Sequence, residues 1–411
     1  MPVLVMKFGG TSVATLDRIK RAAKRVGLEV AKGYDVIVIV SAMSGETNKL
    51  VGFVNETSPL YDAREYDAVV SSGENVTAGL MALTLQEMDI PARSWQGWQV
   101  PVQTTSAHSS ARIEAIPTDN ISAKFNEGMK VAVVAGFQGI SPEGRITTLG
   151  RGGSDTTAVA FAAAFEAERC DIYTDVDGVY TTDPRISSKA RKLEKISFEE
   201  MLELASLGAK VLQTRSVELA MRYKVKLRVL SSFEEPSEEA GTLVCAEEEV
   251  MENRPVSGIA YSRDEAKMTL VDVADKPGIA AAIFGPLSEA GVNVDMIIQN
   301  VAEKGLTDMT FSCPTDQVLR AQKALNDAKG RGDIDFQELI ADTDVCKISA
   351  VGIGMRSQSG VAAKMFKTLS EEGINIKVIA TSEIKISVLI DRKYMELAVQ
   401  ALHDAFELEK L

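Results

Sequence analysis

The chain has 411 residues, of which 45% are hydrophobic and 25% are charged, and its formal net charge is −13 at pH 7. This composition is typical of a globular protein with two or three domains, and the acidic balance argues against nucleic acid as a partner, because binding to phosphates needs a basic surface. Two histidines and four widely spaced cysteines argue against a zinc site or a histidine triad, and we expect a cytoplasmic protein with reduced thiols and no membrane segment.

The first half of the chain alternates apolar runs, rich in β-branched residues, with stretches of helical periodicity. Strands are predicted at residues 3–8, 36–40, 131–137, 170–174 and, as the last of the sheet, 225–230, and helices at residues 16–31 and 75–88. This alternation predicts an α/β fold with an open, mainly parallel sheet and helices on both faces. The polar and glycine-rich loops after these strands should gather at one edge of the sheet, where ligands bind in such folds.

One of these loops, at residues 147–155, lies between a predicted strand and an alanine-rich helix. Gly152 and Gly153 permit a close approach of the backbone to a ligand, and a helix start directs N–H groups and the positive end of its dipole at an anion. Arg151 has the fork geometry that suits a carboxylate or a phosphate. Taken alone, the same residues are also compatible with an ordinary helix cap and a loop arginine.

Four further loops carry groups that could bind a substrate or take part in phosphate chemistry. Lys7 ends the first strand before two glycines and supplies a point charge for a phosphate, although the chain has no Gly-x-x-x-x-Gly-Lys-Ser/Thr loop. Residues 41–49 form a loop rich in hydroxyl groups, and Glu74, in a loop at residues 71–75, could hold an ammonium group. Residues 173–185 offer aspartates, a tyrosine ring and a rigid turn, which suit a nucleotide. Each loop alone is compatible with a capped turn.

The second half of the chain contains a repeat. Residues 234–253 hold eight glutamates and indicate a solvated boundary, within which residues 242–245 could form a short edge strand. Beyond it, residues 277–294 match residues 359–376 at a constant offset of 82 positions. Each copy predicts a βαββα unit with room for a final strand, which is a ferredoxin-like layer. A tandem repeat of this kind can place ligands at the seam between its copies.

Taken in order, the motifs resemble one family, aspartate kinase. The residues that carry the resemblance are Lys-Phe-Gly-Gly-Thr-Ser-Val at 7–13, Ser-Ala-Met-Ser-Gly-Glu-Thr-Asn at 41–48, Ser-Gly-Glu at 72–74, Thr-Leu-Gly-Arg-Gly-Gly-Ser-Asp at 148–155 and Thr-Asp-Val-Asp-Gly-Val-Tyr-Thr-Thr-Asp-Pro-Arg at 174–185. The repeat is similar to the two ACT domains of that family. The resemblance implies an amino-acid-kinase domain at residues 1–245, a linker at 246–262 and ACT domains at 263–341 and 342–411.

The resemblance also implies a reaction and a set of site residues. L-aspartate would be phosphorylated on its side-chain carboxylate by MgATP to give 4-phospho-L-aspartate, the first step towards lysine, threonine, methionine and diaminopimelate. Catalysis would involve Lys7, Arg151 and Asp155. Aspartate would contact Thr47, Glu74 (its ammonium), Arg151 (its α-carboxylate), Gly152, Gly153 and Ser154. ATP would contact Lys7, Phe8, Gly9, Gly10, Ser12, Ser41, Thr174, Asp175, Tyr180, Arg185 and Lys210. No protein cage is expected for Mg²⁺, which usually keeps water and phosphate ligands.

Regulation and assembly are further expectations from the resemblance. Lysine, threonine or both would act as allosteric inhibitors at Asp275, Gly278, Ile279, Gln299, Asn300, Asn375, Ile376, Thr381 and Ser382. A homo-oligomer, dimer or tetramer, would form through the ACT domains. Some relatives make a separate regulatory subunit from an internal start near the position of Met251, and the sequence leaves open whether this chain does so. Because few residues follow the last helix, the second ACT copy should either borrow a strand or remain short.

Three alternatives stay open on the sequence. The chain could phosphorylate another substrate of the same fold, such as glutamate, acetylglutamate, carbamate or UMP. It could also be an amino-acid-binding regulatory protein with an inactive kinase half. A bifunctional kinase–dehydrogenase is the third alternative, but no residues remain for a dinucleotide domain.

Overall fold

The computed structural model describes residues 1–207, 211–235, 241–250, 254–299 and 305–410. The chain forms two compact units. The first unit holds residues 1–179, 192–206 and the described part of 210–251, and the second holds residues 180–191, Leu207 and the described part of 252–411. The chain therefore leaves the first unit after Val179 and returns to it at Lys192. None of the described helices is long and apolar enough to cross a membrane.

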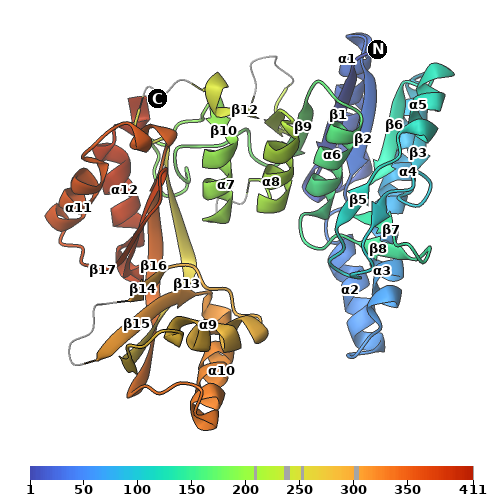
Figure 1. The fold of residues 1–411 in the computed structure, drawn as a ribbon. Helices are drawn as coiled ribbons and strands as arrows, with labels where there is room; N and C mark the ends of the chain where they lie inside the picture. Colours follow the sequence, from blue (N-terminus) through green and yellow to red (C-terminus); the bar gives the residue numbers. More distant parts are fainter. Residues whose placement is uncertain (208–210, 236–240, 251–253, 300–304, 411) are drawn as a thin grey trace. The chain divides into compact units, whose positions relative to one another are not determined.

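An eight-stranded sheet forms the centre of the first unit (Figure 1). Its strands are β1 (Val3–Phe8), β2 (Asp35–Val40), β3 (Ala92–Trp95), β6 (Val131–Ala135), β9 (Cys170–Thr174), β10 (Lys195–Ser197), β11 (Leu227–Ser231) and β12 (Thr242–Cys245). They lie in the order β10-β12-β11-β9-β1-β2-β6-β3, and all neighbours run parallel except β11 and β12. A smaller sheet lies in the order β5 (Ile113–Ala115), β4 (Gln103–Thr104), β7 (Gln138–Ile140) and β8 (Ile146–Thr148).

Helices cover both faces of the large sheet because its central strands are buried on both sides. Leu4, Met6 and Phe8 of β1 belong to the apolar core that α1 and α4 complete, and the alternation of a strand turns Val5 and Lys7 to the opposite face. The helical segments of this unit are η1 (Gly10–Val13), α1 (Leu16–Ala31), α2 (Glu46–Thr57), α3 (Ala63–Val70), α4 (Ser72–Glu87), α5 (Asp119–Asn126), α6 (Gly153–Ala164), α7 (Phe198–Ser206), α8 (Thr214–Tyr223) and η2 (Glu247–Glu249). All four cysteines of the chain are free and buried.

Two predictions about this unit were wrong in detail. The strand predicted at residues 225–230 is not the last of the sheet, because β12 follows it and pairs with both β10 and β11. The helix predicted to begin at residue 75 begins at Ser72. Gly73 suggested a loop there, but a Cβ on Gly73 would lie 2.8 Å from the Cβ of Ala42, so the glycine lets the helix pack closely. Glu74 consequently lies in the first turn of α4.

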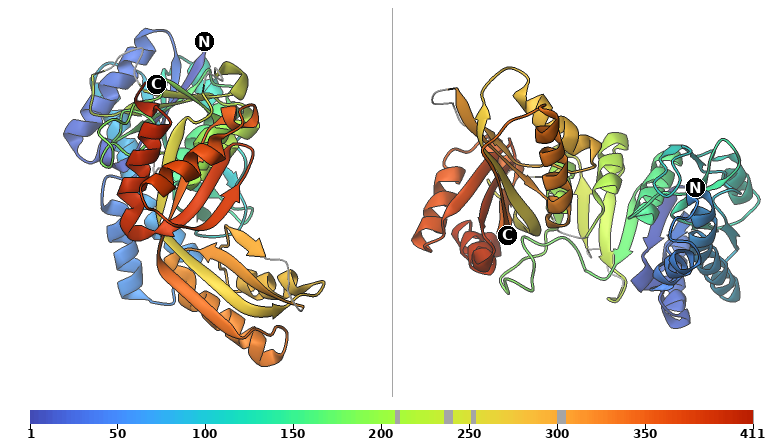
Figure 2. Two further views of the ribbon diagram at one scale, coloured as in Figure 1. Left: turned by 90° about the vertical axis from the view of Figure 1, so that its left-hand side faces the viewer. Right: turned by 90° about the horizontal axis from the view of Figure 1, so that it is seen from below.

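The second unit contains the two repeats, which share one six-stranded sheet in the order β14-β15-β13-β16-β18-β17. Its strands are β13 (Gly258–Ala274), β14 (Ile297–Gln299), β15 (Leu306–Cys313), β16 (Glu338–Val351), β17 (Ile376–Thr381) and β18 (Lys385–Asp391). Its helices are α9 (Ile279–Glu289), α10 (Val318–Arg331), α11 (Val361–Glu371) and α12 (Met395–Ala405), with short turns at η3 (Thr315–Gln317), η4 (Ile353–Arg356), η5 (Arg392–Tyr394) and η6 (Leu408–Lys410). The pairs α9–α10 and α11–α12 pack on separate apolar cores, and Figure 2 shows the two pairs, in gold to orange and in red, at separate places on the shared sheet.

The long strands β13 and β16 each serve both repeats. The first part of β13 begins at Gly258, within the segment expected to be a linker, and pairs antiparallel with the last part of β16, where Gly258 faces Val351. Further along, Leu270 of the first repeat faces Leu339. The second repeat therefore does borrow a strand, from the chain that precedes the first repeat. This explains how its sheet is completed although few residues follow α12.

Candidate active site

The loops that follow β1, β2, β6 and β9 lie at the same edge of the large sheet, since these four strands run parallel. Lys7 pairs in register with Ile39 of β2 and with Ile172 of β9, so it sits at the centre of this edge. Ligands in open parallel sheets bind at such carboxyl ends. The arrangement brings Lys7, Ser41 and Thr174 to the ends of three neighbouring strands, as the sequence predicted.

Lys7 and Asp155 form an ion pair in the middle of this edge. Lys7 Nζ lies 2.5 Å from Asp155 Oδ1, and the two side chains are only 10% and 12% exposed. Asp155 lies in the first turn of α6, so the carboxylate fixes the amine above the sheet edge. A Cβ on Gly9 would lie 3.3 Å from Lys7 Nζ, and the glycine therefore keeps the space beside the amine open. The amine is held rigidly and can meet an anion from the open side.

The turn before α6 depends on its glycines. Gly152 has φ 71° and caps the helix, and a Cβ there would lie 2.1 Å from Gln213 Cγ. A Cβ on Gly153 would lie 2.7 Å from the ring of Phe137. Arg151, which lies between Gly150 and Gly152, is exposed. Its side chain makes no ion pair or hydrogen bond with any residue that the structure describes. The guanidinium is therefore available to an anionic ligand beside a helix start.

Glu74 is a buried carboxylate with one oxygen left over. It is 3% exposed, and its Oε1 accepts a hydrogen bond from the backbone N–H of Ala42 over 3.0 Å. Its Oε2 is buried and has no partner among the described residues. Burial raises the pKa of Glu74 to about 7. A cationic ligand would both satisfy Oε2 and restore the charged form. Thr47, in the first turn of α2, lies on a helix that packs on α4.

Close contacts also hold the loop after β1 in place. Phe8 stacks on Tyr173 with ring centroids 4.7 Å apart, and the Ser12 hydroxyl donates to the backbone oxygen of Tyr173 over 3.3 Å. The backbone N–H of Ser41 donates to the oxygen of Phe8 over 3.1 Å. At the end of β9 the Thr174 hydroxyl donates to Asp175 over 3.2 Å. Phe8, Ser12, Ser41 and Thr174, which are expected to contact ATP, are thus held beside one another at the carboxyl ends of β1, β2 and β9.

Comparisons with known proteins show the family to which the chain belongs. Residues 2–231 match the amino acid kinase family, and residues 267–330 and 348–406 each match an ACT domain. The aspartokinase of Pseudomonas aeruginosa is 54% identical over 411 residues, which cover 100% of this chain and 98% of the relative. The aspartokinase of Corynebacterium glutamicum is 44% identical over 413 residues, with coverages of 99% and 97%. The chain belongs to the aspartokinase family.

A solved structure of the family has the same fold. It is aspartokinase III of E. coli in complex with aspartate and ADP, with a TM-score of 0.81 and 28% identity, covering 98% of this chain and all of that one. The predicted fold class, an open mainly parallel sheet followed by two ACT domains, is confirmed. The predicted enzyme class, aspartate kinase, is confirmed as well. Nucleotide use follows from the same relationship.

In this aspartate kinase, the residues expected to bind ATP are divided between the two units. Thr174 and Asp175 belong to the first unit, whereas Tyr180 and Arg185 lie in the segment that belongs to the second. Arg185 is exposed and forms a fork with Asp183, which also accepts a hydrogen bond from Tyr261 over 2.8 Å. Lys210 lies outside the described residues. The expected ATP residues that the structure describes therefore belong to both units.

The expected effector residues are divided between the two ACT repeats, and β14 and β17, which hold or flank several of them, are the outer strands of the shared sheet. Gln299 Nε2 lies 3.5 Å from Asp275 Oδ1, and Gly278 caps α9 with φ 91°. Asn375, Ile376, Thr381 and Ser382 lie at or beside β17. A small apolar cluster of Met296, Ile298, Val378, Ala380 and Leu389 joins β14 to β17 and β18. Asn300 and Met251 lie outside the described residues.

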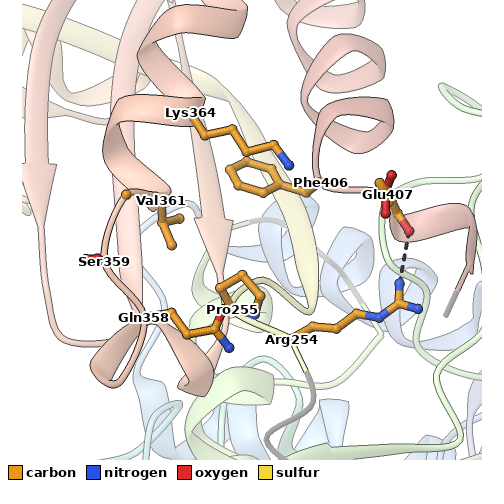
Figure 3. Close-up of a pocket in the computed structure, with 9 residues that line it drawn as sticks. Arg254, Pro255, Gln358, Ser359, Val361, Lys364, Phe406 and Glu407 are labelled. Carbon is orange, nitrogen blue, oxygen red and sulfur yellow. Dashed lines mark hydrogen bonds between the residues drawn. The ribbon is translucent and has the colours of Figure 1, made fainter.

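A cavity of about 390 Å³ lies in the second repeat (Figure 3). It was not predicted, although Gly360 and Val361 in its wall are the counterparts of Gly278 and Ile279 at the repeat offset. Lys364 lies over the ring of Phe406, 5.3 Å from its centre. The full lining is Arg254, Pro255, Gln358, Ser359, Gly360, Val361, Lys364, Phe406 and Glu407.

Sequence reasoning missed one buried pair near the Arg151 turn. It gave neither Asp67 nor His108 a role. In the structure Asp67 is fully buried, and its Oδ2 lies 2.7 Å from His108 Nδ1. The two residues are 41 positions apart and share no motif, so no local signal in the sequence could join them.

Proposed function

We propose that this aspartate kinase transfers the γ-phosphoryl group of MgATP to the side-chain carboxylate of L-aspartate, giving 4-phospho-L-aspartate. The observation that carries the proposal is the charge pattern of the site. Among the described residues, a guanidinium without a partner (Arg151), a buried carboxylate with one unpartnered oxygen (Glu74) and an amine fixed by a carboxylate (Lys7 with Asp155) lie in or beside the loops at the carboxyl ends of the parallel strands. These charges complement an α-carboxylate, an α-ammonium and a phosphoryl group respectively.

Aspartate would be held at its α-carbon. Glu74 would accept hydrogen bonds from the ammonium through its free Oε2, and Arg151 would bind the α-carboxylate in its fork. Thr47, Gly152, Gly153 and Ser154 would line the remaining sides. Because both α-groups are fixed, the side-chain carboxylate is left to point at the phosphoryl group. That carboxylate is already ionised near neutral pH, so the reaction needs no general base.

Phosphoryl transfer asks chiefly for placement and for neutralised charge. Lys7 would contact the transferred group, and the backbone of Gly9 and Gly10, with the Ser12 hydroxyl, would surround it. Phe8, Ser41, Thr174 and Asp175 would complete the nucleotide side in the first unit. Tyr180, Arg185 and Lys210 are proposed to contact ATP as well. Asp155 acts by holding the lysine charge in place.

Mg²⁺ would be held chiefly by the nucleotide. Among the described residues, no group of three histidine, cysteine or acidic side chains could hold a metal ion. Asp155 is already engaged by Lys7. These donors fit a metal that keeps water and phosphate oxygens as its ligands. The ion would neutralise phosphate charge while the side chains position the reactants.

A hydroxamate assay tests the activity directly. Purified protein is incubated with ATP, Mg²⁺ and hydroxylamine, with L-aspartate, L-glutamate or no amino acid. We expect hydroxamate only with aspartate, since hydroxylamine traps an acyl phosphate. Formation of no aspartyl hydroxamate by folded protein would contradict the proposal, and equal activity with glutamate would favour the alternative substrate class.

We further propose that the ACT repeats make the enzyme the controlled first step of the route to lysine, threonine, methionine and diaminopimelate. A relative, aspartokinase III of E. coli, has been solved in complex with lysine and aspartate in a T-state, with a TM-score of 0.76 and 28% identity over 98% of this chain. The effector here would be lysine, threonine or both. Exposed isoleucines at 297, 340 and 379 on the ACT sheet support assembly into a dimer or tetramer through this unit.

Feedback control is tested by two substitutions of expected effector residues. Thr381→Ile fills space at the end of β17, and Gln299→Ala removes the amide beside Asp275. We expect both substitutions to raise the effector concentration for half inhibition at least about tenfold, because one removes a hydrogen bond and the other obstructs the site. The uninhibited rate should remain largely unchanged. Assays use lysine and threonine singly and together. Unchanged inhibition in both variants would exclude these residues as the effector site.

A further inference from the structure

Asp67 on α3 is a fully buried carboxylate to which the roles above assign nothing. Burying such a charge is costly unless donors surround it. The Thr148 hydroxyl donates to Asp67 Oδ1 over 2.5 Å. The backbone N–H of Ser109 donates to both carboxylate oxygens, over 3.0 and 3.1 Å. His108 Nδ1 lies 2.7 Å from Oδ2. Asp67 therefore ties α3 to β8 and to the loop at residues 105–112.

The strand and loop that Asp67 joins lead into the Arg151 turn. Thr148 ends β8, three positions before Arg151, and its backbone oxygen accepts a hydrogen bond from Ala111 over 2.9 Å. Gly150 has φ 76°, and a Cβ there would lie 3.2 Å from the backbone oxygen of Ser109. The loop thus packs against the backbone from which Arg151 projects.

Arg215 on α8 holds the same two segments together from another element. Its guanidinium donates to the backbone oxygen of Leu149 over 2.9 Å and to that of Ala111 over 3.0 Å. Asp67 and Arg215, which carry opposite charges, therefore both hold the segment at residues 109–111 and the segment at residues 148–149. A stretch fixed in this way cannot shift without breaking charged hydrogen bonds.

Asp67 also lies just before the element that carries Glu74. It sits near the end of α3, and α4 begins at Ser72 with Glu74 in its first turn. Gln138 adds a tie between these parts, since its Nε2 donates to the backbone oxygen of Ser71 over 3.0 Å. One buried carboxylate is thereby linked both to the helix that leads into Glu74 and to the strand that leads into Arg151.

We propose that Asp67 and His108 are positioning residues for aspartate, which fix the separation between Glu74 and Arg151. The inference rests on the proposed function, in which those two residues bind the ammonium and the α-carboxylate. Both substrate groups are on one carbon atom, so their partners must keep a fixed spacing. A displacement of about 1 Å at such a site can cost roughly a hundredfold in rate. Asp67 acts through the backbone and touches neither substrate nor phosphate.

His108 contributes through Nδ1 alone. A carboxylate only accepts hydrogen bonds, so Nδ1 carries the proton that Asp67 receives. The side chain is 9% exposed, and Nε2 is buried without a partner among the described residues. Asparagine places an amide near the position of Nδ1, whereas glutamine places it near that of Nε2. His108→Asn should therefore retain the function of the histidine, and His108→Gln should lose it.

Two neighbouring threonines provide the matched test. Thr148 and Thr147 are consecutive in β8 and both are fully buried. Thr148 donates to Asp67, whereas Thr147 shares a hydrogen bond of 2.6 Å with Thr104. Thr148→Val should raise the KM for aspartate roughly fivefold to fiftyfold, as expected for a displaced binding group, while the KM for ATP stays within twofold. Thr147→Val should leave both KM values unchanged at a comparable loss of thermal stability. Equal effects of the two variants on the KM for aspartate would overturn the proposal.

The same comparison in an Arg151→Ala background separates this inference from the proposed function. If Asp67 acts through Arg151, Thr148→Val adds little once the guanidinium is absent, because the two effects are coupled. A normal KM for aspartate in Arg151→Ala would refute the function proposed for Arg151. Two results would refute the positioning role alone. The first is a raised KM for aspartate in Arg151→Ala to which Thr148→Val adds its full effect. The second is a normal KM for aspartate in His108→Gln but not in His108→Asn.

Discussion

At the scale of single residues, Glu74 shows how burial prepares a group for one ligand. Its carboxylate is nearly inaccessible, has one satisfied and one unsatisfied oxygen, and has a pKa raised to about 7 by burial. An isolated buried charge is unfavourable, so the free enzyme holds this group part-protonated near neutral pH. A bound ammonium reverses that preference. If Glu74 holds the ammonium of aspartate as proposed, the affinity for aspartate depends on pH in the neutral range.

The sign of this dependence is a prediction. Ammonium binding needs the ionised form, and below pH 7 a growing share of free enzyme carries the proton. The apparent KM for aspartate should therefore rise about tenfold for each pH unit below 7 and level off above it. Initial rates across the neutral range check this, with the KM for ATP as the internal control. In Glu74→Gln the KM should be high at every pH and nearly flat. A wild-type KM for aspartate that does not change below pH 7 would contradict the assignment.

At the scale of elements, the strands and helices of the first unit follow closely from hydrophobic periodicity. Val3–Phe8, Leu16–Ala31 and Cys170–Thr174 are found where the pattern places them, because buried parallel strands are continuous apolar runs. Short strands such as β10 and β3 were missed, since three or four residues give no clear period. Most of the residues that we propose for the site lie in the sequence motifs and were therefore predictable as candidates. Asp67 and His108 were not, because their partnership arises only from packing.

The Arg151 turn offers a prediction about two glycines with similar backbones. Gly152 and Gly144 both have positive φ, 71° and 74°. A Cβ on Gly152 would lie 2.1 Å from Gln213, whereas one on Gly144 would meet no atom within 4 Å. Both alanine variants should lose roughly 1 kcal/mol of stability from the left-handed backbone. Only Gly152→Ala should also displace the start of α6 and raise the KM for aspartate, by about tenfold or more. Denaturant unfolding and steady-state kinetics measure the two effects. Equal kinetics in both variants would mean that the turn tolerates the displacement.

At the scale of the whole molecule, the path of the chain connects the loop that we propose for the nucleotide to the unit that holds the ACT repeats. Residues 180–191 follow that loop but belong to the second unit. There Thr181 shares a buried hydrogen bond of 2.9 Å with His403 Nε2 on α12, and its backbone oxygen accepts from Ile259 over 2.7 Å. Burial lowers the pKa of His403, which keeps it neutral. The order of elements along the sequence did not indicate that residues 180–191 belong to the second unit.

His403 provides a test of that link. His403→Ala removes the partner of Thr181, and we expect a rise of about threefold to tenfold in the KM for ATP, corresponding to the loss of one buried hydrogen bond, with little change in the KM for aspartate. Met365→Ala is the control, because Met365 is buried in the apolar core on which α12 packs, and its truncation creates a cavity. If Met365→Ala raises the KM for ATP equally, the effect reflects general destabilisation. If neither variant changes it, residues 180–191 do not contribute to ATP binding.

The central proposal is that Arg151 binds the α-carboxylate of aspartate, and one kinetic comparison tests it most directly. Arg151→Ala is compared with Arg145→Ala, an arginine of the neighbouring hairpin that pairs with Glu65 at the surface. We predict that Arg151→Ala raises the KM for aspartate at least about tenfold, as expected for the loss of a charge-assisted pair, and leaves the KM for ATP unchanged, while Arg145→Ala changes neither. An Arg151→Ala enzyme with a normal KM for aspartate, or with an equal rise for ATP, would contradict it.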